Sequence, residues 1–167
     1  MNNTISIDLG LPDMEIIKMN TDKKGNYHIK VRSTKKTGTC HKCGCKIDKF
    51  HGYDRETEIR HLPILGKECY LHIRLPRYEC SSCHKNPTTT QQPQWKNYKS
   101  SHTKNFETYL LDSLVNSTIS DVSRKENISE TKIKGVLETY YPDKISWDSF
   151  DNLGQLGIDE IALKTRA

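Results

Sequence analysis

The sequence predicts an α+β fold in which a β-rich part precedes a helical part. Three observations predict it. Apolar and polar residues alternate in short runs between residues 14 and 75, which is typical of half-buried strands. All six cysteines lie between residues 40 and 83, in a stretch with little helical periodicity. From Thr103 onward the apolar residues recur with the helical period of about 3.6 residues.

The composition argues against one large hydrophobic core. Only 34% of the 167 residues are hydrophobic and the mean hydropathy is -0.78, whereas globular chains average about 45–50% apolar residues. No apolar run approaches the ~20 residues of a membrane helix, and the first residues lack the basic and apolar regions of a secretory signal. We therefore expect a cytoplasmic protein without a membrane partner. In a reducing compartment, six cysteines favour metal binding over disulfides.

Positive charge is concentrated in the middle of the chain. Residues 23–104 contain 18 Lys and Arg against 6 Asp and Glu, and all seven histidines, although the whole chain carries only +5. A block this basic favours a polyanion as partner, and nucleic acid is the usual one in cytoplasm. The alternative is a solvated, lysine-rich surface without a ligand.

Residues 1–34 are expected to form an N-terminal β-hairpin. Apolar residues before the turn Lys24-Gly25-Asn26 are matched after it by Tyr27, Ile29 and Val31, which alternate with polar residues. A hairpin alone is marginal in water, so this one must pack on a later segment of the chain.

Residues 35–100 are expected to form a compact β module with a linker at its end. Two strands, 56–62 and 67–75, are joined across Pro63-Ile64-Leu65-Gly66, and Cys69 lies on the apolar face of the second strand. Residues 86–100 are polar and contain two prolines, which indicates a connector.

Two C-x2-C pairs in this module predict a structural zinc site of the zinc-ribbon type. The expected ligands are Cys40, Cys43, Cys80 and Cys83, with the strands between the pairs bringing them together. Four thiolates fill the tetrahedral coordination, so the zinc is structural and has no open position for water. Cys45 could replace Cys43, and His41 or His84 could compete for the metal. We expect four other histidines at the surface or facing phosphate: His51, His61, His72 and His102.

Residues 101–142 predict three short helices arranged as a helix-turn-helix. Thr118 and Ser129 are suitable N-caps for the second and third helices, with a turn at Asn127-Ile128 and a stop at Pro142. The third helix would then enter the major groove of DNA by its N-terminal end. An ordinary three-helix packing unit without DNA contacts is the alternative. The side chains expected at DNA are Thr131, Lys132 and Lys134 from this helix, with Arg74 and Arg77 from the basic block.

In this order, the segments resemble the N-terminal part of bacterial insertion-sequence transposases of the ISL3 family. The run CHKCGCKIDKFHGYDRETEIRHLPILGKECYLHIRLPRYECSSC resembles the zinc-finger segment of that family, the helices take the place of its helix-turn-helix, and the tail LGIDEIAL resembles the first strand of its catalytic domain. The motifs that carry the resemblance are Cys40-x2-Cys43-Gly44, His51-Gly52-Tyr53, Leu62-Pro63-Ile64 and Arg77-Tyr78-x-Cys80.

The resemblance implies that residues 143–167 are the truncated start of a DDE catalytic domain, a stub of an RNase H-like strand. Family members hold two divalent metals with three carboxylates, and Asp159 matches the first of these. The sequence ends eight residues after Asp159, and Thr165-Arg166-Ala167 stands where family members commonly have Lys-Gly-His. We therefore expect no enzymatic activity from this chain, and Mg²⁺ only in a full-length relative.

Two functions of different classes remain open from the sequence. The first is the DNA-binding portion of a transposase that recognises the terminal inverted repeats of an insertion sequence, as a monomer or a homodimer. The second is a zinc-ribbon transcription regulator or RNA-binding module unrelated to transposition. The tail LGIDEIAL favours the first, because a regulator has no need of an acidic residue flanked by apolar strand residues.

Overall fold

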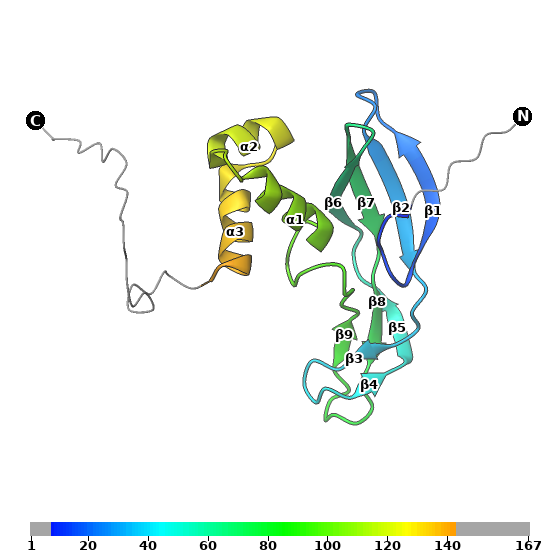
Figure 1. Ribbon diagram of the computed structural model, residues 1–167. Coiled ribbons are helices and arrows are strands. Elements are labelled where there is room, and N and C mark those ends of the chain that lie inside the picture. Colours follow the sequence, from blue (N-terminus) through cyan, green and yellow to red (C-terminus); the bar gives the residue numbers. More distant parts are fainter. Residues whose placement is uncertain (1–7, 143–167) are drawn as a thin grey trace, which may run out of the picture.

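A computed structural model describes residues 8–142 of the chain, so Asp159 and the tail that contains it lie outside the described residues. A larger β-sheet lies beside a helical unit, and two smaller sheets lie at one end of the larger sheet (Figure 1). The strands are β1 (Met14–Thr21), β2 (Tyr27–Ser33), β3 (Gly38–Thr39), β4 (Lys46–Ile47), β5 (Lys49–Tyr53), β6 (Thr57–Ile64), β7 (Lys67–Ile73), β8 (Pro76–Glu79) and β9 (Thr88–Thr90). The helices are α1 (Lys104–Ser113), α2 (Ile119–Glu126) and α3 (Glu130–Tyr140). The predicted α+β class is confirmed.

The largest sheet has four strands in the order β1-β2-β7-β6. The expected N-terminal hairpin is present, and β2 pairs in parallel with β7 from Tyr27 opposite Cys69 to Val31 opposite Ile73. The hairpin therefore packs on a later segment, as its marginal stability alone requires. The sheet also combines strands from both sides of residue 35. Its core is Ile29, Val31, Ile59, Cys69, Leu71, Ile73 and Trp95.

The two cysteine pairs lie on smaller sheets. The first pair is in the loop between β3 and β4, which pair with each other, and the second is in the loop between β8 and β9 of the sheet β5-β8-β9. These short strands bring the pairs together, whereas β6 and β7 belong to the four-stranded sheet. The hairpin of β6 and β7 connects β5 to β8, so it brings the two cysteine pairs together through the pairing of these shorter strands.

Residues 86–100 are more than a connector. Thr88–Thr90 pair with β8 as β9, and both Gln91 and Trp95 are buried. The sequence did not reveal this because three threonines next to prolines and glutamines have no apolar alternation, and the tryptophan is isolated in a polar stretch.

The three predicted helices are present and share a small core. Thr118 accepts a hydrogen bond from the Asp121 N–H at 3.1 Å, and its hydroxyl donates to the Asp121 carboxylate at 2.7 Å, so Thr118 is confirmed as the N-cap of α2. Ser129 precedes α3 as expected but makes no side-chain capping bond. The turn between α2 and α3 passes through Asn127 in the left-handed conformation. The buried residues are Phe106, Leu110, Val122, Ile133 and Val136.

The helical unit is attached to the four-stranded sheet through the free edge of β6. The backbone N–H of Arg60 donates to Ser101 O and that of Thr103 donates to Arg60 O, both at 2.9 Å, which extends the sheet by one short parallel bridge at His102. Thr103 is also the N-cap of α1. The helix therefore starts where the sheet edge ends, and α1 lies beside β6 (Figure 1).

Candidate metal centre and nucleic-acid interface

The first cysteine pair lies on a tight turn closed by backbone hydrogen bonds. The Cys40 N–H donates to Cys45 O, and the Gly44 N–H donates to Cys40 O, both at 2.9 Å. Gly44 has a φ of +71°, which a glycine adopts without steric cost. The Lys42 N–H also points at the Cys40 sulfur at 3.4 Å. This geometry directs backbone dipoles at the sulfur, where they stabilise a thiolate.

The second pair lies on a similar turn without glycine. The Cys80 N–H donates to Pro87 O at 3.0 Å and the Asn86 N–H donates to Cys83 O at 3.1 Å. Lys85 and Asn86 take the left-handed conformation, with φ values of 66° and 43°. Asparagine adopts this conformation more readily than most residues, whereas a lysine in it costs free energy, so the surroundings of the turn must hold Lys85 in place.

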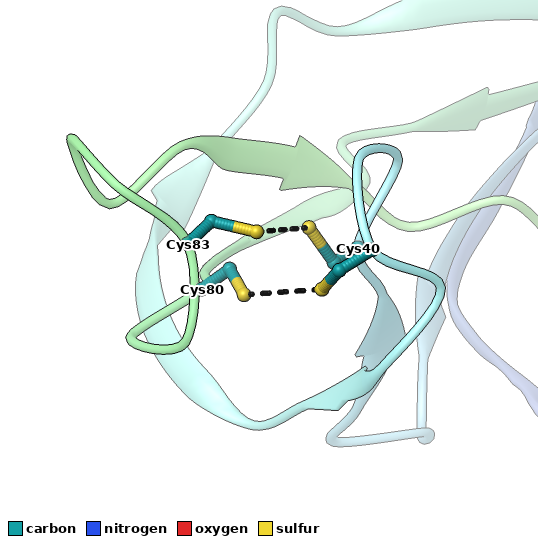
Figure 2. Close-up of side chains that lie close together, drawn as sticks. Cys40, Cys80 and Cys83 are labelled. Carbon is teal, nitrogen blue, oxygen red and sulfur yellow. Dashed lines mark hydrogen bonds between the residues drawn. The ribbon is translucent and has the colours of Figure 1, made fainter.

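The two turns face each other and bring four sulfurs together. Cys40 Sγ lies 3.9 Å from Cys83 Sγ, and Cys43 Sγ lies 3.7 Å from Cys80 Sγ (Figure 2). All four sulfurs are within 4.8 Å of one another. Tetrahedral zinc with Zn–S bonds of about 2.3 Å requires sulfurs about 3.7 Å apart, so the cluster fits a structural zinc ion. Cys45 is exposed and lies outside the cluster; its carbonyl closes the first turn.

The pKa values of Cys40 and Cys83 are shifted in opposite directions by their surroundings. Backbone N–H groups of Cys43 and Lys42 lower the pKa of Cys40 to about 6. The pKa of Cys83 is raised, first by its contact with the Cys43 thiol and then by burial and the other two sulfurs. Removal of the proton from Cys83 therefore calls for a cation between the sulfurs, which a bound metal would supply.

Apart from the cysteine cluster, few buried contacts stabilise the zinc ribbon, which consists of β3, β4, β5, β8 and β9. Ile47 and Tyr78 are the buried apolar residues that pack against its cysteines. The Tyr78 hydroxyl donates to Lys35 O at 3.2 Å, and the buried Gln91 amide donates to the carbonyls of Lys35 and Thr37. These bonds fix the segment of residues 35–37, which leads into β3 and the first cysteine turn. Sequence reasoning missed Gln91, whose burial no pattern in its polar segment indicates.

The predicted DNA-contact residues of α3 lie on its exposed side. Thr131, Lys132 and Lys134 are all exposed, and Lys134 pairs with Glu130 at 3.9 Å within the helix. Lys132 also faces the groove between α3 and residues 97–102, close enough to contribute to lowering the pKa of buried His102. The side chains of these three residues are therefore all accessible on α3, but they do not all point in the same direction.

The other two predicted contacts lie at the junction of the two sheet regions. Arg74 is exposed and donates to Asp54 O at 3.3 Å. Arg77 is half-buried, donates to Thr88 Oγ1 at 2.6 Å and lies near the Asp54 carboxylate, whose pKa is lowered mainly by the Arg55 N–H and Thr90 and also by Arg77. The exposed Arg74 side chain can therefore contact a ligand, whereas the Arg77 guanidinium is already bonded to Thr88 within the protein.

A buried arginine that the sequence did not single out joins the sheet to the helices. Arg60 pairs with Glu68 at 2.9 Å and stacks its guanidinium over the rings of Tyr70 and Phe106 at 4.9 and 5.3 Å. Glu68 in turn accepts a hydrogen bond from Asn127 of the α2–α3 turn. Two of the histidines expected at the surface, His61 and His102, are also buried at this junction, because they fill the space where residues 101–103 meet β6.

Comparison with protein families agrees with this geometry. A model described as the zinc-finger of transposase IS204/IS1001/IS1096/IS1165 matches residues 36–83. A model described as the helix-turn-helix domain of transposase family ISL3 matches residues 91–141. The chain belongs to the ISL3 transposase family. It carries the N-terminal part of that family, and the expected zinc finger and helix-turn-helix are confirmed.

No curated protein and no solved structure matches the chain. The ISL3 models cover the zinc finger and the helix-turn-helix, and neither of them is a catalytic domain. Within residues 8–142, no helix has the length and hydrophobicity needed to cross a bilayer.

Proposed function

We propose that this chain recognises the terminal inverted repeats of an insertion sequence, as the DNA-binding part of a transposase. The supporting observation is the joint between the two modules. Backbone pairing at β6 and the Arg60–Glu68–Asn127 contacts connect the helix-turn-helix to the four-stranded sheet. The zinc ribbon joins the same sheet through β5, which leads into β6, and β8, which follows β7. Two DNA-binding surfaces held at a fixed separation fit an extended site better than a single short one.

The two modules would divide the work of recognition. The charged side chains of α3 are Glu130, Lys132, Lys134 and Glu138, which sum to zero. A helix without net positive charge is suited to base contacts more than to attraction of phosphate. The basic block of residues 23–104, with its balance of +12, supplies that attraction from the sheets and the ribbon.

Zinc has a structural role in this proposal. Cys40, Cys43, Cys80 and Cys83 hold one zinc ion, which keeps the ribbon folded at the junction where Arg74 is exposed. The ion takes no part in chemistry, because four thiolates leave no position for water.

Residues 1–167 alone are proposed to bind DNA without cutting it. Asp159 is the single carboxylate that the family resemblance assigns to a site for two Mg²⁺ ions. Two-metal catalysis needs several carboxylates to hold both ions about 3.5–4 Å apart. The expected result is neither nicking nor joining of repeat DNA with Mg²⁺, and unchanged DNA binding in Asp159→Ala.

Fluorescence anisotropy with a duplex of the element's terminal repeat, and with a shuffled duplex of the same composition, tests the proposal. We expect preference for the repeat, and a slope of log K against log[salt] near about -5 if six phosphates are contacted. Thr131→Ala and Lys132→Ala should weaken binding more than Lys18→Ala, an exposed lysine on β1.

Equal affinity for the two duplexes would contradict recognition of the repeat. Tighter binding of a structured RNA competitor than of either duplex would favour the RNA-binding alternative.

A further inference from the structure

A cluster of two histidines and a glutamate lies on the polar face of the four-stranded sheet, away from the cysteines. His28 is on β2, His72 on β7 and Glu58 on β6, which are neighbours in the sheet. Glu58 lies directly opposite His72 on one side, and Lys30 lies opposite His72 on the other. His28 precedes Lys30 by two residues and so shares its face of β2. Strand register therefore places the three side chains on one face.

The donor atoms of these side chains converge. His28 Nδ1 lies 2.9 Å from His72 Nε2, and His72 Nε2 lies 3.8 Å from Glu58 Oε2. The three donor atoms are all within 4.8 Å of one another. A metal with bonds of about 2.0–2.1 Å holds two adjacent ligand atoms about 2.9 Å apart when the bonds are at right angles. The distance between the two histidine nitrogens therefore fits metal ligands as well as a hydrogen bond. We propose that His28, His72 and Glu58 form a second metal site, for a divalent transition-metal ion.

The surroundings of His28 orient it for this role. Its ring stacks on Tyr70 with centroids 5.2 Å apart and planes 16° apart. Its second nitrogen, Nε2, lies 3.7 Å from Asp22 Oδ2, and Asp22 is itself fixed by hydrogen bonds from the turn residues Lys24 and Asn26. A carboxylate behind the far nitrogen of a metal-bound histidine fixes the ring and raises its basicity.

The donor set and its accessibility indicate the kind of ion. Imidazole nitrogens suit zinc, copper, nickel and iron, and one carboxylate with two imidazoles leaves positions for water or another ligand. The half-buried histidines and exposed Glu58 leave the site open to solvent. Such a site exchanges its ion more readily than the cysteine cluster. A bound ion would link β2, β7 and β6, and β6 carries the helical unit.

Cobalt titration of the full chain, already holding zinc at its cysteines, tests this inference. Cobalt at imidazole and carboxylate ligands gives weak visible bands without the strong thiolate charge-transfer absorption of a cysteine site. We expect one further ion per chain with the weak spectrum. The variant His72→Gln should lose at least about tenfold in affinity for cobalt, because even outer ligand partners contribute 10–100-fold.

His51→Gln is the matched control, because His51 also lies beside a carboxylate, Glu79 at 3.4 Å, but on another sheet. It should bind cobalt as the wild type does. Glu58→Gln changes an exposed residue and provides a second variant if His72→Gln fails to fold; it should also weaken cobalt binding. Absence of a further ion in the wild type, or equal affinity in the wild type and Glu58→Gln, would overturn the second site and leave a plain hydrogen bond between two histidines.

Discussion

Replacing Cys80 with serine is expected to release zinc and unfold the ribbon while the four-stranded sheet stays folded. Cys80 is fully buried, and the apolar residues packed with the cysteines are Ile47 and Tyr78. At about 1.5–3 kcal/mol for each large buried side chain, these two contribute about 3–6 kcal/mol. A structural zinc contributes about 10–16 kcal/mol. The metal is therefore the larger source of stability in this part of the chain.

The four-stranded sheet has a different source of stability, since its core contains seven buried residues and no zinc ligand. Hydrogen exchange measured by mass spectrometry separates the two regions. Amides of β3, β4, β5, β8 and β9 should lose protection in Cys80→Ser, whereas those of β2 and β7 should keep it. Cys45→Ser, an exposed change outside the cluster, should alter neither. Full protection of the ribbon amides in zinc-free Cys80→Ser would refute this reasoning.

Three further changes test the joint and the helices. Arg60→Met should destabilise the chain by about 3 kcal/mol in urea unfolding, because it removes the positively charged partner of the half-buried Glu68 carboxylate. Glu68→Leu in the same chain should restore part of the loss, and no difference between the single and double variants would contradict the role of the pair. Thr118→Ala should cost about 1 kcal/mol of stability and Ser129→Ala less, because of these two residues Thr118 alone makes a side-chain capping bond. Equal thermal shifts in the two variants would contradict this. Burial, with a smaller effect of nearby Lys132, lowers the pKa of His102 to about 4 from 6.5. Between these pH values the unfolded chain protonates His102 and the folded chain does not, so the stability should fall as the pH falls from about 6.5 to 4. His102→Gln should show a shallower decline of stability than the wild type, and parallel curves of stability against pH would contradict this role of His102.

Much of the fold could be predicted from local sequence patterns. Alternation predicted the hairpins, spacing predicted the cysteine cluster, and Thr118 predicted the start of α2. Each of these depends on residues close in sequence or on a motif with a fixed geometry.

Features that depend on distant segments were not predictable in the same way. Nothing in β2 or β7 alone indicates that they pair in parallel across more than 40 residues, since both have the alternation of any half-buried strand. The bridge from residues 101–103 to β6 is made by backbone groups, which any sequence supplies. The burial of Arg60 was not predictable for a related reason. An arginine in a basic block is normally a surface residue, and the rings on which Arg60 stacks come from distant parts of the chain.

The most direct measurement of function is hydroxyl-radical footprinting of the terminal repeat with the zinc-loaded chain and with zinc-free Cys80→Ser. If the ribbon and the helix-turn-helix bind one DNA end together, the zinc-loaded chain will protect two patches of the backbone at a fixed spacing. Loss of zinc will then remove one patch and leave the patch of α3. A single patch that is unchanged by loss of zinc would contradict joint recognition by the two modules.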